Sequence, residues 1–308
     1  MISVVIPLHN KERSINTTLK SVCNQSYTDV EIIVIDDGST DNSAQFASAY
    51  PDTRIRVIKK MNGGVCSARN RGIVEAKGDY IALLDADDVW DMEYLNEQVR
   101  MIYDFPDAVM WSINFAETNN GIITRRYETG LPDGYRGYVK NYFNIPGRVS
   151  DLFHPSSVVI RKEVFSKVGM FDERIKYSED SDMWFRINAV YKTAFYDKIL
   201  VSYQQDTENR AMNKTRRLKD WLPYYVDKFN TPLYRKNIVF YRWINRWCAG
   251  RIRNSYFSKN KQDYSDAKVA IDKLDFSMLP YKYKLFFRMP YIIAQIIYKI
   301  DCLRMSWK

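Results

Sequence analysis

The sequence lacks the features that mark several large classes of protein. No G-x-G-x-x-G run follows the first predicted strand and no G-x-x-x-x-G-K-[ST] run occurs anywhere, which excludes the usual dinucleotide fingerprint and the P-loop. No apolar stretch approaches about 20 residues, the length that spans a bilayer. The 308 residues contain no internal repeat and no low-complexity segment. A non-repetitive globular protein remains.

Cysteine and histidine are scarce. The four cysteines are scattered and form neither a metal-binding pattern nor a disulfide framework, so we expect reduced thiols in the cytoplasm. The two histidines, His9 and His154, are too few for a histidine-rich metal site, and we interpret His154 as a packed side chain. Because the chain begins directly with an apolar run, we expect no signal peptide.

Hydrophobic and charged residues are abundant. A hydrophobic content of 46% with 15% aromatic residues indicates a folded core. The net charge of +9 is uneven: residues 209–308 carry 22 Lys and Arg against 7 Asp and Glu, whereas residues 1–208 carry 24 against 30. This asymmetry predicts a domain boundary near residue 208 and an anionic partner for the basic part, either a membrane surface or nucleic acid.

Short apolar runs alternate with helical patterns in the first half of the chain. Strands are predicted over residues 2–7, where Pro7 should end the strand, and over 31–35, 54–58 and 80–84. Helices are predicted between them, so the fold class is α/β with a mostly parallel, doubly wound sheet. Further strands are predicted at 107–116, 156–160 and 193–203, a hairpin or mobile loop at 117–150, and helices beyond residue 208.

Acidic residues follow two of the predicted strands. Asp36 and Asp37 end one strand, and Asp85, Asp87 and Asp88 follow another. Because the carboxyl ends of parallel strands share one edge, both sets can meet in one crevice and hold Mg²⁺ or Mn²⁺. From the residues alone, a solvated acidic loop that caps the next helix is an equal alternative, and Asp37 fits a turn before glycine as well as a contact to a base N–H.

A third acidic set and one arginine complete the candidate residues. Glu179, Asp180 and Asp182 stand at a predicted helix start, where a carboxylate beside an apolar wall can act as a general base. Helix-dipole stabilisation is the alternative, and it explains one or two such acids well but three less well. Arg69, one turn into its predicted helix, can reach a nucleotide or pair with a surface acid.

The order of these motifs resembles the family-2 glycosyltransferases with the GT-A fold. The resemblance covers about two-thirds of the chain and is carried by residues 4–10, 34–41, 62–72, 78–88, 169–173 and 178–184. It implies a nucleotide-diphospho-sugar transferase domain at 1–208, with a nucleotide-binding half at 1–116 and an acceptor-side half at 117–208. Residues 209–308 form a helical, basic C-terminal region.

The resemblance also implies roles for single residues. The donor is a nucleotide sugar and transfer inverts the anomeric carbon. Pro7 and Asn10 line the nucleotide pocket, Asp37 reads the base, expected to be uracil, and Arg69 contacts the nucleotide.

The catalytic assignments follow from the same resemblance. Asp85 and Asp87 form the D-x-D motif that holds Mn²⁺ or Mg²⁺, Asp180 is the base, and Glu179 and Asp182 orient the sugars. Many relatives have a metal-binding histidine where this chain reads residues 202–207 without one, so Asp206 is a candidate replacement ligand.

The basic C-terminal region suggests a partner. Residues 290–305 place isoleucines at helical spacing between basic residues, as in an interfacial helix on anionic lipid. Packing on the catalytic domain or in an oligomer is the alternative. We expect a glycan or lipid-linked sugar acceptor, a peripheral position on the inner face of the plasma membrane, and no nucleic acid.

Two other functions are compatible with parts of the sequence. A sugar nucleotidyltransferase also uses paired acids and Mg²⁺, but it should carry a glycine-rich basic loop where this chain has residues 7–10. A non-catalytic binder of acidic polymer or nucleic acid would explain the basic region and leave the acidic motifs unexplained.

Overall fold

The computed structural model describes residues 1–119, 121–145, 152–205, 207–208, 217–257 and 261–305, with side chains described as far as residue 298. The chain divides into two compact units, Met1–Lys214 and Thr215–Lys308. The boundary near residue 208 that the charge asymmetry predicts, and the finer split at residue 116, stay predictions. Among the described helices, none is long and apolar enough to cross a membrane.

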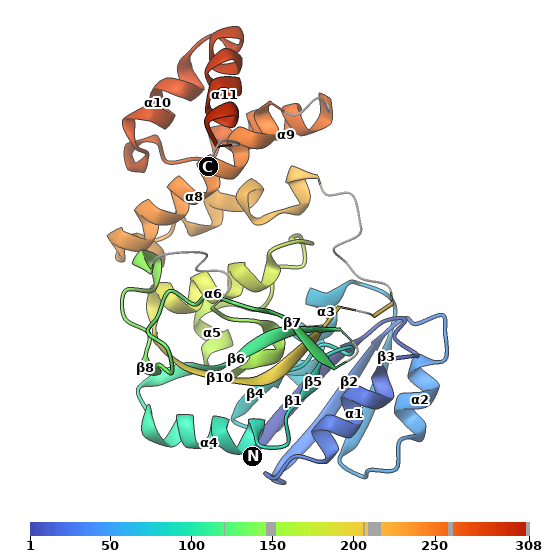
Figure 1. The fold of residues 1–308 in the computed structure, drawn as a ribbon. Helices are drawn as coiled ribbons and strands as arrows, with labels where there is room; N and C mark the ends of the chain where they lie inside the picture. The colour runs from blue at the N-terminus through green and yellow to red at the C-terminus, as the bar shows by residue number, and fades with distance from the viewer. Residues whose placement is uncertain (120, 146–151, 206, 209–216, 258–260, 306–308) are drawn as a thin grey trace. The chain divides into compact units, whose positions relative to one another are not determined.

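One mixed sheet organises the first unit (Figure 1). In the described residues its order is β3-β2-β1-β4-β9-β6-β10-β5, with β7 paired to β6 and β8 to β10. The strands are β1 (Ile2–Leu8), β2 (Val30–Asp37), β3 (Ile55–Lys60), β4 (Tyr80–Leu83), β5 (Val89–Trp90), β6 (Ala108–Asn119), β7 (Ile122–Arg126), β8 (Arg136–Tyr138), β9 (Val158–Arg161) and β10 (Lys192–Gln204).

Strand direction decides which residues meet at the edge of the sheet. Strands β3, β2, β1 and β4 are parallel, which confirms the α/β class expected from the alternating pattern. Strand β9 is antiparallel to both of its neighbours, β4 and β6. The residues just before β9 therefore lie beside the residues just after β4, where the acidic run begins.

Among the described residues, this unit has six α-helices. They are α1 (Ile15–Cys23), α2 (Ser43–Ala49), α3 (Val65–Glu75), α4 (Tyr94–Asp104), α5 (Val164–Val168) and α6 (Glu179–Val190). Helix α3 approaches β1 so closely that a Cβ on Gly72 would lie 2.2 Å from Cγ1 of Val5. Only glycine allows this contact, which fixes α3 and Arg69 against the sheet.

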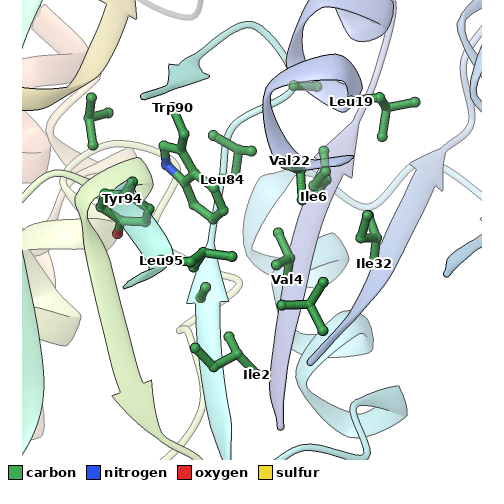
Figure 2. Packing of buried hydrophobic residues seen from close by; sticks show 14 of the residues in the cluster. Ile2, Val4, Ile6, Leu19, Val22, Ile32, Leu84, Trp90, Tyr94 and Leu95 are labelled. Atoms are coloured by element: carbon green, nitrogen blue, oxygen red, sulfur yellow. The ribbon is translucent and has the colours of Figure 1, made fainter. Parts of the chain in front are cut away.

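The main core cluster of this unit is mostly aliphatic, with Trp90 and Tyr94 among its members, and it packs on β1, its neighbouring strands and α1 (Figure 2). Ile15, Leu19 and Val22 recur at helical spacing and are fully buried. They pack in one cluster with alternate residues of β1, among them Val4 and Ile6. The cluster holds the strand ends that carry the polar residues described below.

The prediction that Pro7 ends the first strand was wrong. β1 continues through Pro7 to Leu8, and Pro7 pairs with Ile35 of β2. On the other side, the pairing with β4 ends at Val5, whose carbonyl accepts from the amide of Leu84. In a parallel ladder, alternate residues bond to the same side, so the missing N–H of Pro7 falls where β4 has already ended.

Residues 117–150, predicted as a hairpin or mobile loop, begin with a hairpin, and the strand predicted at 107–116 extends into it. Strand β6 runs on to Asn119 and pairs antiparallel with β7. The β7 residues are all exposed.

The second unit is helical, as the pattern beyond residue 208 predicts. Its helices are α7 (Pro232–Arg235), α8 (Ile238–Tyr256), α9 (Lys261–Asp272), α10 (Tyr281–Arg288) and α11 (Tyr291–Met305). Phe240, Ile244, Cys248 and Ile252 form a fully buried stripe along α8. This stripe is the centre of the unit.

Candidate active site

Arg69 joins two of the predicted motifs. It lies on α3 and is only 2% exposed. Its Nη2 donates to Oδ1 of Asp85 at 2.7 Å, and its Nη1 donates to Oε1 of Glu179 at 3.1 Å. Its Nε is buried and has no hydrogen-bond partner among the described residues. One guanidinium therefore brings the acid after β4 and the acid that opens α6 into the same site.

The acids at the start of α6 are poorly solvated. Burial and then the nearby charge of Asp180 raise the pKa of Glu179 to about 7. Burial also raises the pKa of Asp180, although its Oδ1 accepts from the amide of Ser181 at 2.6 Å. A carboxylate whose pKa is raised is a stronger proton acceptor, so this end of α6 is suited to take a proton from a hydroxyl.

Asp182 has a different setting from its neighbours. It is fully buried, and its Oδ2 accepts from Nε of Arg186 at 2.9 Å. Arg186 in turn donates to the carbonyls of Val168, Gly169 and Met170. This pair ties α6 to the turn after α5, and a sugar-orienting role for Asp182 stays a prediction.

Asp37, the predicted base reader, is buried at the end of β2. Its Oδ1 accepts from Nζ of Lys60 at 2.5 Å and from the amide of Gly63 at 2.9 Å, and its Oδ2 accepts from the amide of Gly64 at 2.7 Å. These bonds hold the loop that leads into α3. Gly38 follows with φ +71°, where a Cβ would lie 2.9 Å from the amide nitrogen of Asn62.

The loop after β1 lies against the loop after β2. Asn10 has a left-handed backbone, with φ 52°, and its Oδ1 accepts from the amide of Thr40 at 2.8 Å. The amide of Asn10 donates to Oγ of Ser39 at 3.2 Å. The structure thus brings Asn10 close to the loop that follows Asp37, as a shared pocket requires.

A group with the chemistry of a divalent-cation site lies beyond β4. Asp85, Asp88 and His154 place ligand atoms within 4.8 Å of one another. Burial, followed by the charges of Asp87 and Asp85, holds the pKa of Asp88 well above its ordinary value. A nearby cation would stabilise the negative charge of this buried carboxylate. A set of carboxylate oxygens with one imidazole suits Mn²⁺ and also accepts Mg²⁺. The residues therefore fit the expected cofactor.

His154 is predicted from the sequence to be a packed side chain. Its ring does pack between Phe115 and Tyr203, with centroids 4.8 and 4.7 Å away. Burial also lowers its pKa to about 4, which leaves the imidazole neutral, the form that binds metal. In the sequence, the one sign of a role for His154 is its position directly before the strand predicted at 156–160. That position brings His154 close to the acidic residues only because β9 pairs antiparallel with β4.

Lys11 is a second residue that sequence reasoning missed. Its Nζ donates to Oδ2 of Asp87 at 2.6 Å and to the carbonyl of Glu208 at 2.5 Å. Thr207 Oγ1 donates to the same Asp87 oxygen at 2.8 Å. Asp87 is thereby neutralised by an ammonium, and its metal-binding role stays a prediction. Asp206 lies outside the described residues.

The sequence is similar to those of known glycosyltransferases. The family model described as "Glycosyl transferase family 2" matches residues 3–169. An uncharacterized glycosyltransferase of Rickettsia prowazekii, RP339, is 28% identical over 236 residues, which cover 74% of this chain and 72% of that protein. The uncharacterized glycosyltransferase EpsJ of Bacillus subtilis is 43% identical over 195 residues, 59% of this chain and 54% of that protein.

Solved structures show the same fold. The crystal structure of S. aureus TarS 1–349 superposes with a TM-score of 0.68 at 17% identity, covering 90% of this chain and 82% of that one. The complex of TarS 1–349 with UDP-GlcNAc gives a TM-score of 0.61 at 18% identity, covering 95% and 79%. At this identity the likeness shows the fold alone.

The fold and the matched family define the class of protein as a glycosyltransferase with the GT-A fold. The family model covers more than half of the chain, so the chain belongs to glycosyl transferase family 2. The resemblance seen in the motifs is thereby confirmed.

Proposed function

We propose that this enzyme transfers a sugar, with inversion, from a UDP-sugar to a hydroxyl of a glycan or lipid-linked acceptor during synthesis of a cell-surface polysaccharide. The observation that carries the proposal is the buried Arg69, which holds Asp85 and Glu179 in one site. The complex of TarS with UDP-GlcNAc supports the choice of donor by analogy of fold. Membership of glycosyl transferase family 2 argues against the sugar nucleotidyltransferase considered from the sequence.

Three sets of residues would bind the donor. Asn10 and Asp37, at the ends of β1 and β2, would hold the base and ribose, and Pro7 would line the pocket. The buried Nε of Arg69 has no hydrogen-bond partner in the described part of the chain and would donate to the nucleotide sugar. Asp85, Asp88 and His154, with Asp87 as the further predicted ligand, would hold Mn²⁺ or Mg²⁺. The cation would neutralise charge that develops on the leaving diphosphate.

The chemical step is a direct displacement in this proposal. The Asp180 carboxylate removes the proton of the acceptor hydroxyl while that oxygen attacks C1 of the sugar. The bond from C1 to the phosphate oxygen breaks, and its electron pair leaves with the nucleoside diphosphate. The raised pKa of Asp180 favours proton transfer, and Glu179 and Asp182 would orient the sugars.

Asp180→Asn tests the base. We expect transfer to fall by about 10²–10⁴-fold, the usual contribution of a general base, while UDP affinity is nearly unchanged. The control is Glu163→Gln, which alters a carboxylate that is 76% exposed. Sugar transfer and UDP binding are measured on both variants, and an equal loss of both in Asp180→Asn would remove Asp180 from this role.

The proposal also includes the location of the enzyme. We propose peripheral contact with the anionic inner face of the plasma membrane through the basic region 209–308. Its charge supports this, because 22 Lys and Arg stand against 7 Asp and Glu. A lipid-linked acceptor would be reached from that surface.

A further inference from the structure

Helix α11 exposes a stripe of isoleucines. Ile292, Ile293, Ile296 and Ile297 are 71%, 49%, 55% and 38% exposed. They lie at positions that share one face of a helix, which we call the isoleucine face. Contiguous exposed aliphatic side chains are uncommon on a monomer and mark an interaction site.

The opposite face of α11 is already used for packing. Ala294 is fully buried, and Tyr291 and Tyr298 contact Phe257 with ring centroids 5.6 and 4.6 Å away. Phe257 is also contacted by Phe286 of α10, at 5.4 Å. Both helices therefore pack on Phe257, the residue that follows α8, and the isoleucine face is not needed to hold α11 in place.

The charge around this face decides what can cover it. Residues 276–308 carry six Lys and Arg against a single acid, Asp301. On α10, Lys282 and Arg288 are exposed, together with Tyr281 and Leu285. A second copy that pairs through the same face would bring an equally positive surface to it, whereas anionic lipid headgroups have the complementary charge.

The length of α11 sets its orientation on a bilayer. Its 15 residues span about 22 Å, which is shorter than the hydrocarbon core of about 30 Å. A helix of this length with one aliphatic face lies in the plane of the interface, with its apolar side chains below the headgroups.

We infer that the isoleucine face of α11 inserts into the surface of an anionic bilayer, with basic residues of α10 on the headgroups. This inference rests on the membrane contact in the proposed function and specifies α11 as the helix that inserts. It does not depend on glycosyl transfer, because it needs neither donor nor acceptor.

Vesicle sedimentation of the full chain tests it. The protein should sediment with vesicles of phosphatidylcholine and phosphatidylglycerol, and less with phosphatidylcholine alone or at high salt. Ile292→Ser with Ile296→Ser should weaken binding by about tenfold or more, because the variant no longer transfers two exposed isoleucine side chains from water into the bilayer. Lys282→Gln with Arg288→Gln should weaken binding to the anionic vesicles only, also by about tenfold.

The matched control is Ile122→Ser on β7, because Ile122 is 71% exposed, as Ile292 is. It should bind vesicles as the unchanged protein does. Thermal unfolding of each variant checks that these surface changes leave the fold intact.

Three results would overturn the inference: no sedimentation of the unchanged protein, equal loss in Ile122→Ser, or a dimer in solution that the double serine change dissociates. The last result would assign the face to a second copy. Transfer to a water-soluble acceptor, measured in parallel, reports separately on the proposed chemistry.

Discussion

Arg69 offers the sharpest test of the site, through the change Arg69→Met. Methionine keeps much of the side-chain length and removes the charge that Asp85 and Glu179 share at 2.7 and 3.1 Å. Removing one partner of a buried ion pair costs about 3–5 kcal/mol, because the remaining charge is uncompensated. Asp85 is 27% exposed and keeps some water, so we expect a loss near the lower end, about 3 kcal/mol.

Urea unfolding of both proteins measures this loss, and pH adds a second criterion. Arg69 lowers the pKa of both acids, so its removal lets them keep protons in the folded state. The difference between the two proteins should therefore be largest near neutral pH and shrink as the pH falls.

Arg71→Met is the matched control on the same helix. Arg71 is half-exposed and pairs with Glu75 at 2.8 Å, so its loss should cost less than about 1 kcal/mol. Equal losses for the two variants, or a loss in Arg69→Met that does not vary with pH, would refute the argument that Arg69 neutralises this site.

Two further predictions concern the neighbouring groups. His154→Gln should weaken Mn²⁺ binding by about tenfold or more, because the imidazole that lies beside Asp85 and Asp88 is lost. Calorimetric titration with Mn²⁺ measures the affinity, and an unchanged affinity would exclude His154 as a ligand. The pKa of Glu179 is about 7 in the folded protein, above its ordinary value of 4.5. Between these pH values the folded protein binds a proton that the unfolded chain has lost, so the free energy of unfolding should fall as the pH rises from 4.5 to 7. Glu179→Gln should flatten that slope in urea unfolding, and an unchanged slope would show that Glu179 is not its source.

The sequence predicts the parts of this fold that local patterns determine. The apolar runs at 31–35 and 80–84 form β2 and β4, and Ile15, Leu19 and Val22 face the core as their spacing predicts. The acidic residues after β4 and at the start of α6 are visible as motifs because their residue types are unusual beside buried elements.

The remaining features depend on contacts between distant segments. Nothing local in residues 158–161 shows that β9 inserts antiparallel between β4 and β6, and this insertion is what brings His154 to Asp88. Lys11 reaches Asp87 across 76 residues of sequence, and a lone lysine after a strand carries no signal of that partner. The prediction that Pro7 ends β1 was wrong because the missing N–H of Pro7 would interrupt the sheet only if β4 still paired with β1 at that residue.

In the proposed function, acids from separate strand ends form one site for a cation and a nucleoside diphosphate. Calorimetric titration of UDP, with and without Mn²⁺, tests it most directly. We predict UDP binding that depends on Mn²⁺ and is lost in Asp87→Ala. UDP binding of equal strength without metal, or retained in Asp87→Ala, would contradict the account.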